Sequence, residues 1–328
     1  MVYIVLIVYN GWYDTLVCVE SIFKSNYTNF KIVIIDNKSD KNFDSKEIFI
    51  KKFSKILVTV KVENKEYFFD DLIDKAQIWI IDNDENNGFA AGVNCAFQFI
   101  KMQKNINYIW LLGNDNVIKY DSLNNLVMYM KENNQTDICG SISLAYYDKE
   151  KIQCAGVGIY NKWTGRSKHL LVGKNISDIN KNEIYEALNK NSKYELYIYG
   201  NSMFLSKEFF DNMSNLPENY FIYYEELEIM QQLKSFNMKY GVAVNSIVYH
   251  KEGSSTGGNK NSMSCIADYY AIRNRILYTL KYHKICLVTI YIGICVTILK
   301  RIWKKQFNRI PMILKIMVNP YPKFNERY

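Results

Sequence analysis

Apolar runs alternate with stretches of helical periodicity over the first 120 residues of the chain. Four runs are mostly apolar, rich in β-branched residues and too short for helices: VYIVLIVYN, FKIVIID, IWIIDN and YIWLLGN. Between them, TLVCVESIFKS and NCAFQFIKM repeat apolar residues at helical spacing. Strands that are apolar on both faces are typical of parallel sheets, because helices cover both sides of such a sheet. The pattern therefore predicts an α/β fold with a mostly parallel, Rossmann-like sheet and helices on both faces.

Polar side chains collect at the ends of these predicted strands. They are Tyr9, Asn10, Asp36, Asn37, Asp115 and Asn116. Ligands of open α/β sheets bind beyond the carboxyl ends of the strands, so these positions belong to one candidate pocket. Carboxylate and amide groups there can hydrogen-bond the edge of a pyrimidine base and a ribose hydroxyl. The alternative interpretation is that they form ordinary Asx-type turns at the strand ends.

The pattern changes in the later part of the chain. Residues 121–199 have little periodicity and predict only a mixed α+β region. From Ser264 to about Lys305 the pattern is helical and contains ICLVTIYIGICVTIL, an uncharged run of 15 residues. This run is shorter than the roughly 20 residues that span a bilayer. With its basic flanks and Trp303 it favours a helix on a membrane surface or a hairpin, and the alternative is a buried helix of the globular body.

The charge of the chain lies almost entirely in its tail. Residues 281–328 contain ten Lys and Arg against Glu326 alone, which gives +9 there and leaves −1 of the total +8 for the rest. A neutral body with a basic, apolar tail argues against nucleic-acid binding and favours contact with an anionic membrane surface.

The cysteines and the first residues of the chain indicate in which cellular compartment we expect the protein. Seven cysteines are scattered without a C-x-x-C pair, and the chain has three histidines, which fits neither a zinc site nor a disulfide framework. The initial strand-like run has no basic region and no small-residue cleavage site, so we expect no signal peptide. We therefore expect the protein in the reducing cytoplasm.

Two segments are candidates for phosphate and cation binding. In NNGFAAGVN, two glycines four apart lead into a helix, which would allow close backbone approach and direct a helix N-terminus at a phosphate. Tight packing of that helix on the sheet explains the same small residues equally well. Asp115, at a strand end, suits Mg²⁺ or Mn²⁺ bridging a diphosphate, because these cations prefer oxygen ligands.

Three carboxylates, Glu225, Glu226 and Glu228, open a predicted helix after the aromatic run YFIYY. One interpretation is simple charge complementarity with the helix dipole. The other is a general base in an aromatic pocket, where burial would raise the pKa of the base towards working pH.

Seven motifs occur in a fixed order over roughly residues 1–275. They are IVYN, VIIDNKS, NNGFAAGVN, WLLGNDN, FIYYEELEI, VYHKEGSS and YYAIRNR. In this order they resemble the family 2 glycosyltransferases of the GT-A fold, especially the rhamnosyltransferase-like branch that builds bacterial surface polysaccharides. The resemblance implies a GT-A type sheet that binds a nucleotide-sugar.

The resemblance implies a role for each matching residue. The nucleotide base and ribose would be held by Tyr9, Asn10, Asp36 and Asn37. The donor diphosphate and sugar would be held by Asn87, Gly88, Asn94 and Asp115. The metal would be bound by Asp115 and His250, and the catalytic base would be Glu226. The acceptor side, or the support around it, would be formed by Tyr224, Glu225, Glu228, Arg273 and Asn274.

Two of these assignments have a structural alternative. His250 could cap the following turn, and Arg273 with Asn274 could be a buried capping pair. The chain also departs from the family pattern at three positions. Gly113 stands where the family has Asn or Asp, Glu226 is one methylene longer than the usual Asp, and Gln232 replaces an arginine.

We therefore predict an inverting glycosyltransferase that uses a nucleotide-diphospho-sugar, a divalent cation and a saccharide acceptor that is lipid-linked. The predicted parts are a nucleotide-sugar-binding half (1–118), an acceptor-binding half (119–262) and a basic helical tail (263–328) that associates with a membrane. We expect a peripheral protein at the cytoplasmic face of a bacterial inner membrane. The alternative is a catalytically impaired scaffold subunit of a glycan synthase. A nicotinamide-dependent oxidoreductase is disfavoured, because the first turn, GWYDTL, lacks the glycine fingerprint.

Overall fold

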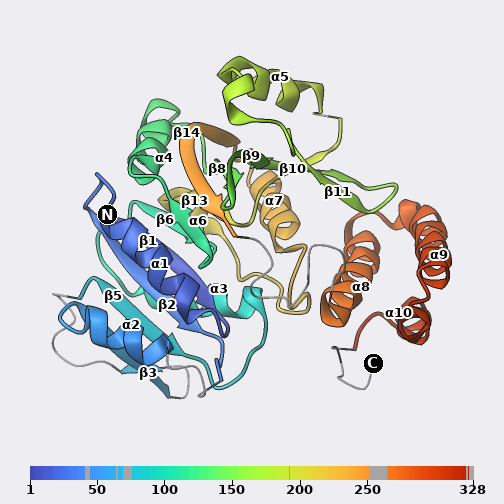
Figure 1. Ribbon diagram of the computed structural model, residues 1–328, viewed down its shortest axis with the longest axis horizontal. Coiled ribbons are helices and arrows are strands. Elements are labelled where there is room, and N and C mark those ends of the chain that lie inside the picture. Colours follow the sequence, from blue (N-terminus) through green and yellow to red (C-terminus); the bar gives the residue numbers. More distant parts are fainter. Residues whose placement is uncertain are drawn as a thin grey trace.

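The computed structural model describes residues 1–40, 45–63, 66–68, 76–191, 193–251, 264–322 and 324. Figure 1 shows a central twisted sheet with helices on both sides, and a group of three helices beside it at the end of the chain. Part of the predicted VYHKEGSS motif, from residue 252 onward, lies outside the described residues.

One large sheet organises the described part of the chain. Its order is β4 (Glu66–Phe68), β3 (Leu57–Glu63), β5 (Ile78–Asp82), β2 (Phe30–Asp36), β1 (Val2–Val8), β6 (Tyr108–Leu112), β13 (Ser202–Ser206), β8 (Ile138–Ala145), β14 (Tyr240–His250) and β7 (Asn116–Ile118), with β9 (Asp148–Ala155) paired to β8. Strands β3, β5, β2, β1 and β6 are parallel, whereas β13 runs antiparallel to β6 and β8. The first half is thus the predicted parallel sheet.

Helices cover both faces of this sheet because each central strand is apolar on both sides. In β1, Val2, Ile4 and Leu6 join one buried cluster, while Tyr3 and Val5 join the other. The first cluster is closed by α1 (Trp12–Phe23), α2 (Ser45–Phe53) and α4 (Ser122–Glu132). The second is closed by α3 (Phe89–Lys101), α6 (Lys207–Asn212) and α7 (Glu225–Ser235). This confirms the predicted α/β architecture with helices on both faces.

The first part of the poorly periodic region 121–199 supplies α4, β8 and β9 to the main sheet and its covering helices, and the rest forms a second, three-stranded sheet and one amphipathic helix. The sheet has the order β11 (Arg166–His169), β10 (Val157–Asn161) and β12 (Glu195–Ile198), and the helix is α5 (Lys181–Lys190). A capping box between Asn180 and Glu183 fixes the start of α5. In Figure 1 the β10–β11 hairpin reaches towards the C-terminal helices.

Three helices follow β14: α8 (Cys265–Tyr282), α9 (Leu287–Trp303) and α10 (Ile310–Val318). Leu277 and Tyr278 of α8 belong to the core of the body, whereas α9 and α10 pack with the first part of α8 in a separate cluster. Asp268 of α8 is buried and binds Arg301 at 2.7 Å and Arg309 at 3.0 Å, which joins the three helices. Helix α8 is therefore continuous with the body, although the sequence suggested that the tail begins at 263.

The apolar helix of the tail is longer than its uncharged run. Together with the preceding turn it extends over Lys284–Trp303, a 20-residue stretch that is long and apolar enough to cross a membrane by length and composition. The uncharged run of 15 residues lies inside this stretch, and the helix continues beyond it through Lys300 and Arg301. Length alone does not separate a spanning helix from one lying on a surface or packed in a body.

Candidate active site

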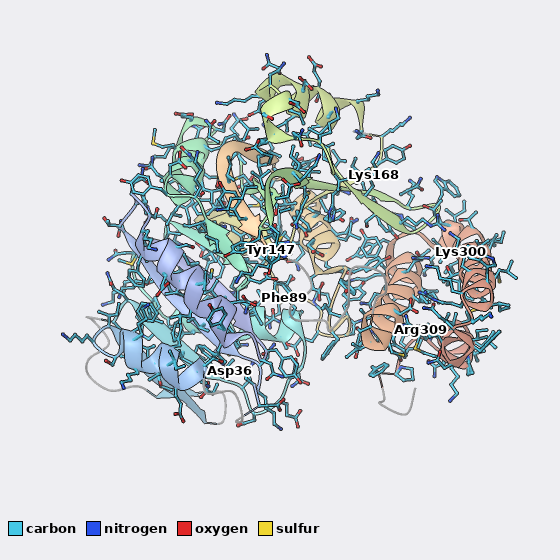
Figure 2. The ribbon with its side chains drawn as sticks, in the orientation of Figure 1. Asp36, Phe89, Tyr147, Lys168, Lys300 and Arg309 are labelled. Atoms are coloured by element: carbon cyan, nitrogen blue, oxygen red, sulfur yellow. The ribbon has the colours of Figure 1, made fainter. Side chains whose placement is uncertain are left out.

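Several of the strand-end residues predicted from the sequence are already bonded to other groups of the protein. The carboxylate of Asp36 is buried and accepts hydrogen bonds from the amide of Ser39 at 2.8 Å and from Lys46 at 2.6 Å. Lys46 reaches across to Asp82 at 2.7 Å, so it joins the ends of β2 and β5. Figure 2 shows Asp36 at this edge of the sheet. A base or ribose would therefore meet an existing ion-pair network rather than a free carboxylate.

The two residues after β1 differ in their exposure. Asn10 has a left-handed backbone (φ 57°), and its side chain exchanges two hydrogen bonds with Asp40, at 2.7 and 3.2 Å. The side chain of Tyr9 is 40% exposed. Of this pair, Tyr9 is thus the one with an open ring face for a base to stack on.

Gly88 makes a close approach, but its partner is protein backbone. With φ at +93°, a Cβ at this position would lie 2.6 Å from Cα of Phe221 and nearer still to its carbonyl. The next amide, of Phe89, donates to the Phe221 carbonyl at 2.8 Å, and Asn37 donates to the Gly88 carbonyl at 3.0 Å. The first amide of α3 is therefore used to hold the loop before α7, which neither sequence interpretation foresaw.

Asn94 and Asn87 occupy different surroundings. Asn94 is buried and exchanges two hydrogen bonds with the backbone of Leu216, at 2.8 and 2.9 Å, and donates to Glu218 at 2.9 Å. Its amide thus fastens 216–218 onto α3. Asn87 instead lines a surface hollow of about 470 Å³ together with Asn83, Asp84, Glu85, Ala91 and Cys95. The carboxylates of this hollow would repel a diphosphate.

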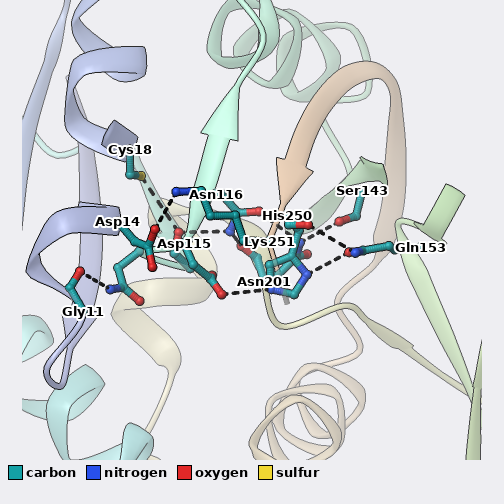
Figure 3. Close-up of polar contacts among 12 residues, drawn as sticks. Gly11, Asp14, Cys18, Asp115, Asn116, Ser143, Gln153, Asn201, His250 and Lys251 are labelled. Atoms are coloured by element: carbon teal, nitrogen blue, oxygen red, sulfur yellow. Dashed lines mark hydrogen bonds and ion pairs between the residues drawn. The ribbon is translucent and has the colours of Figure 1, made fainter. Parts of the chain in front are cut away.

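Asp115 and His250 form a pair of potential metal ligands (Figure 3). Nε2 of His250 lies 3.5 Å from Oδ2 of Asp115, and Nδ1 lies 2.8 Å from Oε1 of Gln153. The amide nitrogen of Gln153 donates to the carbonyl of His250 at 3.2 Å, which fixes the orientation of the Gln153 amide. Because the amide oxygen can only accept, it places an imidazole proton on Nδ1 and leaves Nε2 facing Asp115.

These two groups fit a hard divalent cation only as part of a larger ligand shell. The described residues contain no cluster of three or more His, Cys, Asp or Glu side chains that could hold a metal. Mg²⁺ and Mn²⁺ commonly take one or two protein ligands and complete their shell with phosphate oxygens and water. Asp115 and His250 match that requirement, with the remaining positions supplied by a diphosphate.

The side chains around position 113 explain why this residue is a glycine. A Cβ there would lie 2.6 Å from Nδ2 of Asn116. Asn116 uses that amide to donate to the carbonyls of Gly113, at 3.0 Å, and Asn201, at 3.1 Å. Asn116 thus occupies the space into which a longer side chain at 113 would extend.

Lys251 adds a positive charge beside the Asp115–His250 pair. Its Nζ lies 2.5 Å from Oδ1 of Asp14 and 4.9 Å from the ring centroid of Tyr146. Its backbone amide donates to the carbonyl of Asp115 at 3.3 Å. The backbone of Lys251 is thus held at Asp115, while its ammonium group is paired with Asp14.

Glu226 is held by Gly200. A Cβ at Gly200 would lie 2.8 Å from both Cγ and Cδ of Glu226, and the amide of Gly200 donates a hydrogen bond to the carboxyl group. Burial raises the pKa of Glu226 above its ordinary value, and the hydrogen bond from Gly200 offsets part of that effect. A carboxylate with a raised pKa is a better proton acceptor near neutral pH.

One turn joins this carboxylate to the Asp115–His250 pair. Tyr199 packs its ring edge-on to His250, with 6.1 Å between centroids. Gly200 contacts Glu226, and Asn201 bonds Asn116 and Ser143. Three consecutive residues therefore connect the candidate base and the candidate metal ligands, which places both in one site.

The other two carboxylates of α7 differ from Glu226. Glu225 is buried and its Oε1 has no hydrogen-bond partner, so burial first and the charge of Glu226 second raise the pKa of Glu225 well above its ordinary value. Glu228 accepts from Tyr220 at 2.6 Å, from Tyr282 at 2.6 Å and from Lys281 at 2.9 Å. Glu228 therefore ties α7 to α8 and has no oxygen left for an acceptor.

Arg273 and Asn274 hold the loop that precedes α7. Phe221, Tyr223 and Tyr224 in this loop have left-handed backbones, with φ of 67°, 68° and 79°. Asn274 donates to the carbonyls of residues 220, 222 and 223 at 2.7–3.2 Å. Arg273 donates to the carbonyls of 219, 321 and 322 at 2.5–3.0 Å. Both side chains are buried, so the pair stabilises a strained loop, as its capping interpretation predicted.

The comparison with protein families identifies the family of this chain. The sequence profile of Glycosyl transferase family 2 matches residues 3–179, which is more than half of the chain. The chain belongs to glycosyl transferase family 2. This match includes the strand ends and the Asp115 loop, and it ends before Gly200 and Glu226. A search among curated proteins found no match to this glycosyltransferase.

Solved structures show the same fold at low sequence identity. The glycosyltransferase superposes on GalNAc-T7 with UDP, GalNAc and Mn²⁺ at a TM-score of 0.61 and 16% identity, covering 89% of this chain and 50% of the other. The mannosyltransferase PcManGT from Pyrobaculum calidifontis with GDP-Man and Mn²⁺ gives 0.52 and 8%, covering 97% and 86%. TarS 1–349 of S. aureus with UDP-GlcNAc gives 0.50 and 13%, covering 85% and 66%. The chain spans about half the length of the GalNAc-T7 chain, and these likenesses establish the GT-A fold.

Sequence reasoning missed three residues that build the site of this glycosyltransferase. Gln153 orients His250, Gly200 holds Glu226, and Lys251 places a cation beside Asp115. Gln153 gives no signal, because its strand is brought to His250 by the sheet and not by nearby sequence. Lys251 lies inside the VYHKEGSS motif, in which only His250 was assigned a role, and Gly200 lies outside the seven motifs.

Proposed function

We propose that this glycosyltransferase moves a sugar, with inversion at the anomeric carbon, from a nucleotide-diphospho-sugar to a hydroxyl of a lipid-linked saccharide. The donor sugar is a hexose or deoxyhexose, and the product belongs to bacterial surface polysaccharide. The supporting observation is the 199–201 turn, which joins Glu226 to the Asp115–His250 pair. A base on one side and an anion-binding group on the other is the arrangement that a single displacement requires.

In this mechanism the Glu226 carboxylate accepts the proton of the acceptor hydroxyl. The acceptor oxygen forms the new bond to the anomeric carbon from the face opposite the leaving group. The bond between that carbon and the diphosphate oxygen breaks, and the diphosphate takes the electron pair. The raised pKa of Glu226 serves proton transfer, and the Lys251 ammonium, paired with Asp14, would turn to the diphosphate when the donor binds.

A divalent cation, Mg²⁺ or Mn²⁺, would supply neutralisation of the charge that develops on the leaving diphosphate. Asp115 would hold it through Oδ2 and His250 through Nε2, with Gln153 keeping the Nε2 lone pair available. Their proximity to the Lys251 cation supports a shared anionic ligand at this place.

The test combines binding with turnover. Calorimetric titration with UDP, dTDP and GDP, with and without Mn²⁺, is expected to give metal-dependent binding of one nucleotide and so to name the donor class. Glu226→Gln should abolish transfer and donor hydrolysis while nucleotide binding stays near normal. Full activity in that variant would remove Glu226 from the base role. Metal-independent binding without any turnover would instead favour the scaffold alternative.

A further inference from the structure

Helix α9 has an apolar face that nothing in the described part of the chain covers. Ile285, Val288, Ile292, Leu299 and Trp303 recur at intervals of three, four, seven and four residues and are 59–83% exposed. Residues at this spacing lie along one side of a helix. No charged residue lies between Ile285 and Leu299, and Lys300 is the first one after them. The outer face of α9 therefore presents a continuous aliphatic stripe that ends in an exposed tryptophan.

The opposite face of α9 is attached to α8 and α10 along its length. Ile290 and Ile294 are buried in the cluster with α8 and α10. The hydroxyl of Tyr291 donates to the carbonyl of Met317 at 2.9 Å, and Arg301 binds Asp268. A helix fastened in this way offers lipid only its outer face, so a surface position fits it better than a spanning one, despite its length.

A second segment, the tip of the β10–β11 hairpin, is joined to the start of α9. The hydroxyl of Thr289 donates to the carbonyl of Trp163 at 2.6 Å. At Gly165 a Cβ would lie 2.8 Å from Cδ1 of Ile290, so the hairpin turn packs directly on α9. Trp163 itself is 49% exposed. The hairpin tip thus extends the α9 face at the end opposite Trp303.

The charge of this combined surface indicates which kind of partner it binds. Residues 157–177 and 283–322 contain no Asp or Glu. Exposed basic residues flank the apolar stripe at Lys162, Arg166, Lys168, Lys284, Lys300, Lys304 and Lys305. Lys168 and Lys300 are labelled in Figure 2 on the hairpin and on α9. A second copy of the chain docked face to face here would bring these like charges together, whereas an anionic lipid surface complements them.

We propose that the outer face of α9 and the tip of the β10–β11 hairpin form one membrane-binding surface, which lies on an anionic bilayer with Trp163 and Trp303 at the headgroup level. Tryptophan favours that level because its ring is apolar and its N–H is polar.

This surface is close to the catalytic helix. The hydroxyl of Tyr224 donates to the carbonyl of Gly165 at 3.4 Å, and Tyr224 directly precedes α7. If the proposed function holds, the hairpin places the acceptor side of Glu226 near the bilayer, where a lipid-linked saccharide is confined. Binding of the surface to lipid does not itself depend on the proposed function.

Tryptophan fluorescence gives a selective test, since Trp12, Trp79 and Trp110 are fully buried. The purified full chain is mixed with vesicles of phosphatidylcholine containing about a third of phosphatidylglycerol, with brominated acyl chains as quenchers. Quenching is expected, and it should fall by roughly half in Trp163→Phe and in Trp303→Phe. Quenching that is unchanged in both variants would overturn the proposal.

Substitutions on the stripe provide the second measurement. Val288→Glu and Leu299→Glu should each weaken vesicle binding at least about tenfold, because each puts a charge into the apolar contact. The matched control is Ile48→Glu, an equally exposed helical position on α2, which should bind like the parent chain. Folding of every variant is checked by circular dichroism and nucleotide titration.

Two results would contradict the proposal in different ways. If the stripe variants change the mass of the particle in light scattering but leave vesicle binding intact, the surface is an interface between copies. If high salt and alkaline carbonate both fail to release the full chain from vesicles, α9 spans the bilayer. Release by salt in part and by carbonate in full is the expected outcome. Transfer activity takes no part in these readouts, so failure of the proposed function would leave them unchanged.

Discussion

Gly200→Ala tests whether the position of Glu226 limits the reaction. The added Cβ would lie 2.8 Å from Cγ and Cδ of Glu226, whereas carbon atoms pack at about 3.5–4.0 Å. The Glu226 side chain must therefore move by about 1 Å. The clash involves the end of a flexible side chain, so the fold should tolerate the substitution.

The expected effect is on turnover. A displacement of about 1 Å at a reacting group can cost about 10²-fold in rate, which corresponds to about 2.7 kcal/mol. We expect kcat to fall by that factor while the Kd for nucleotide and Mn²⁺ stays within about twofold, because Asp115 and His250 are untouched.

The assay follows nucleoside diphosphate release from the donor named by titration, at saturating donor and acceptor. Gly293→Ala is the matched control, because nothing lies within 4 Å of its added Cβ, and it should keep full activity. Glu226→Gln gives the lowest kcat expected, that of the enzyme without its base. Wild-type kcat in Gly200→Ala, beside an inactive Glu226→Gln, would refute the idea that Gly200 sets the position of the base.

Three further predictions concern stability and metal binding. Burial raises the folded-state pKa of Glu225, so its stabilising contribution is present below the ordinary value of 4.5 and is lost as pH rises through the folded pKa. Urea titrations at several pH values should therefore show that Glu225→Gln is as stable as the parent near pH 4 and more stable at higher pH. The gain in the free energy of unfolding should be about 1.4 kcal/mol per unit of raised pKa. Equal stability of the two proteins at neutral pH would contradict this. Gln153→Leu should weaken Mn²⁺ binding in the nucleotide complex about 10–100-fold, as measured by electron paramagnetic resonance. Gln153→Glu keeps the hydrogen-bond acceptor and should bind Mn²⁺ like the parent. An equal loss in both variants would mean that Gln153 does not orient His250. Asn274→Ala removes a donor from three loop carbonyls, of which that of Tyr220 keeps the amide of Ile222, and should lower the free energy of unfolding by about 2–4 kcal/mol. Asn125→Ala, which removes one solvent-exposed hydrogen bond to the carbonyl of Asn245, should change it by under about 0.5 kcal/mol; equal effects would show that the loop needs no such support.

The sequence was most informative where a residue's surroundings follow from local pattern. The strands β1, β2, β5 and β6 are buried on both faces, so continuous apolar runs identified them and their helices. The carboxyl ends of these strands could be placed at one edge for the same reason.

The partners of polar side chains could not be predicted, because they depend on contacts between distant segments. Asn94 binds Leu216, Gly88 meets Phe221, and Gln153 reaches His250 across the sheet. Local periodicity carries no information about such pairs. Antiparallel β13, inserted between β6 and β8, is what brings the 199–201 turn to both Asp115 and Glu226.

The 199–201 turn also determines how the site responds to motion. Successive Cα atoms are about 3.8 Å apart, so the contacts to His250, Glu226 and Asn116 begin from points separated by at most about 7 Å along one short piece of chain. The contacts to the base and to the candidate ligand His250 therefore start from one short segment of chain and not from two separate lobes. Glu228 ties α7 to α8, so a movement of α8 on a membrane would be transmitted to the helix that carries Glu226 and from there to this turn.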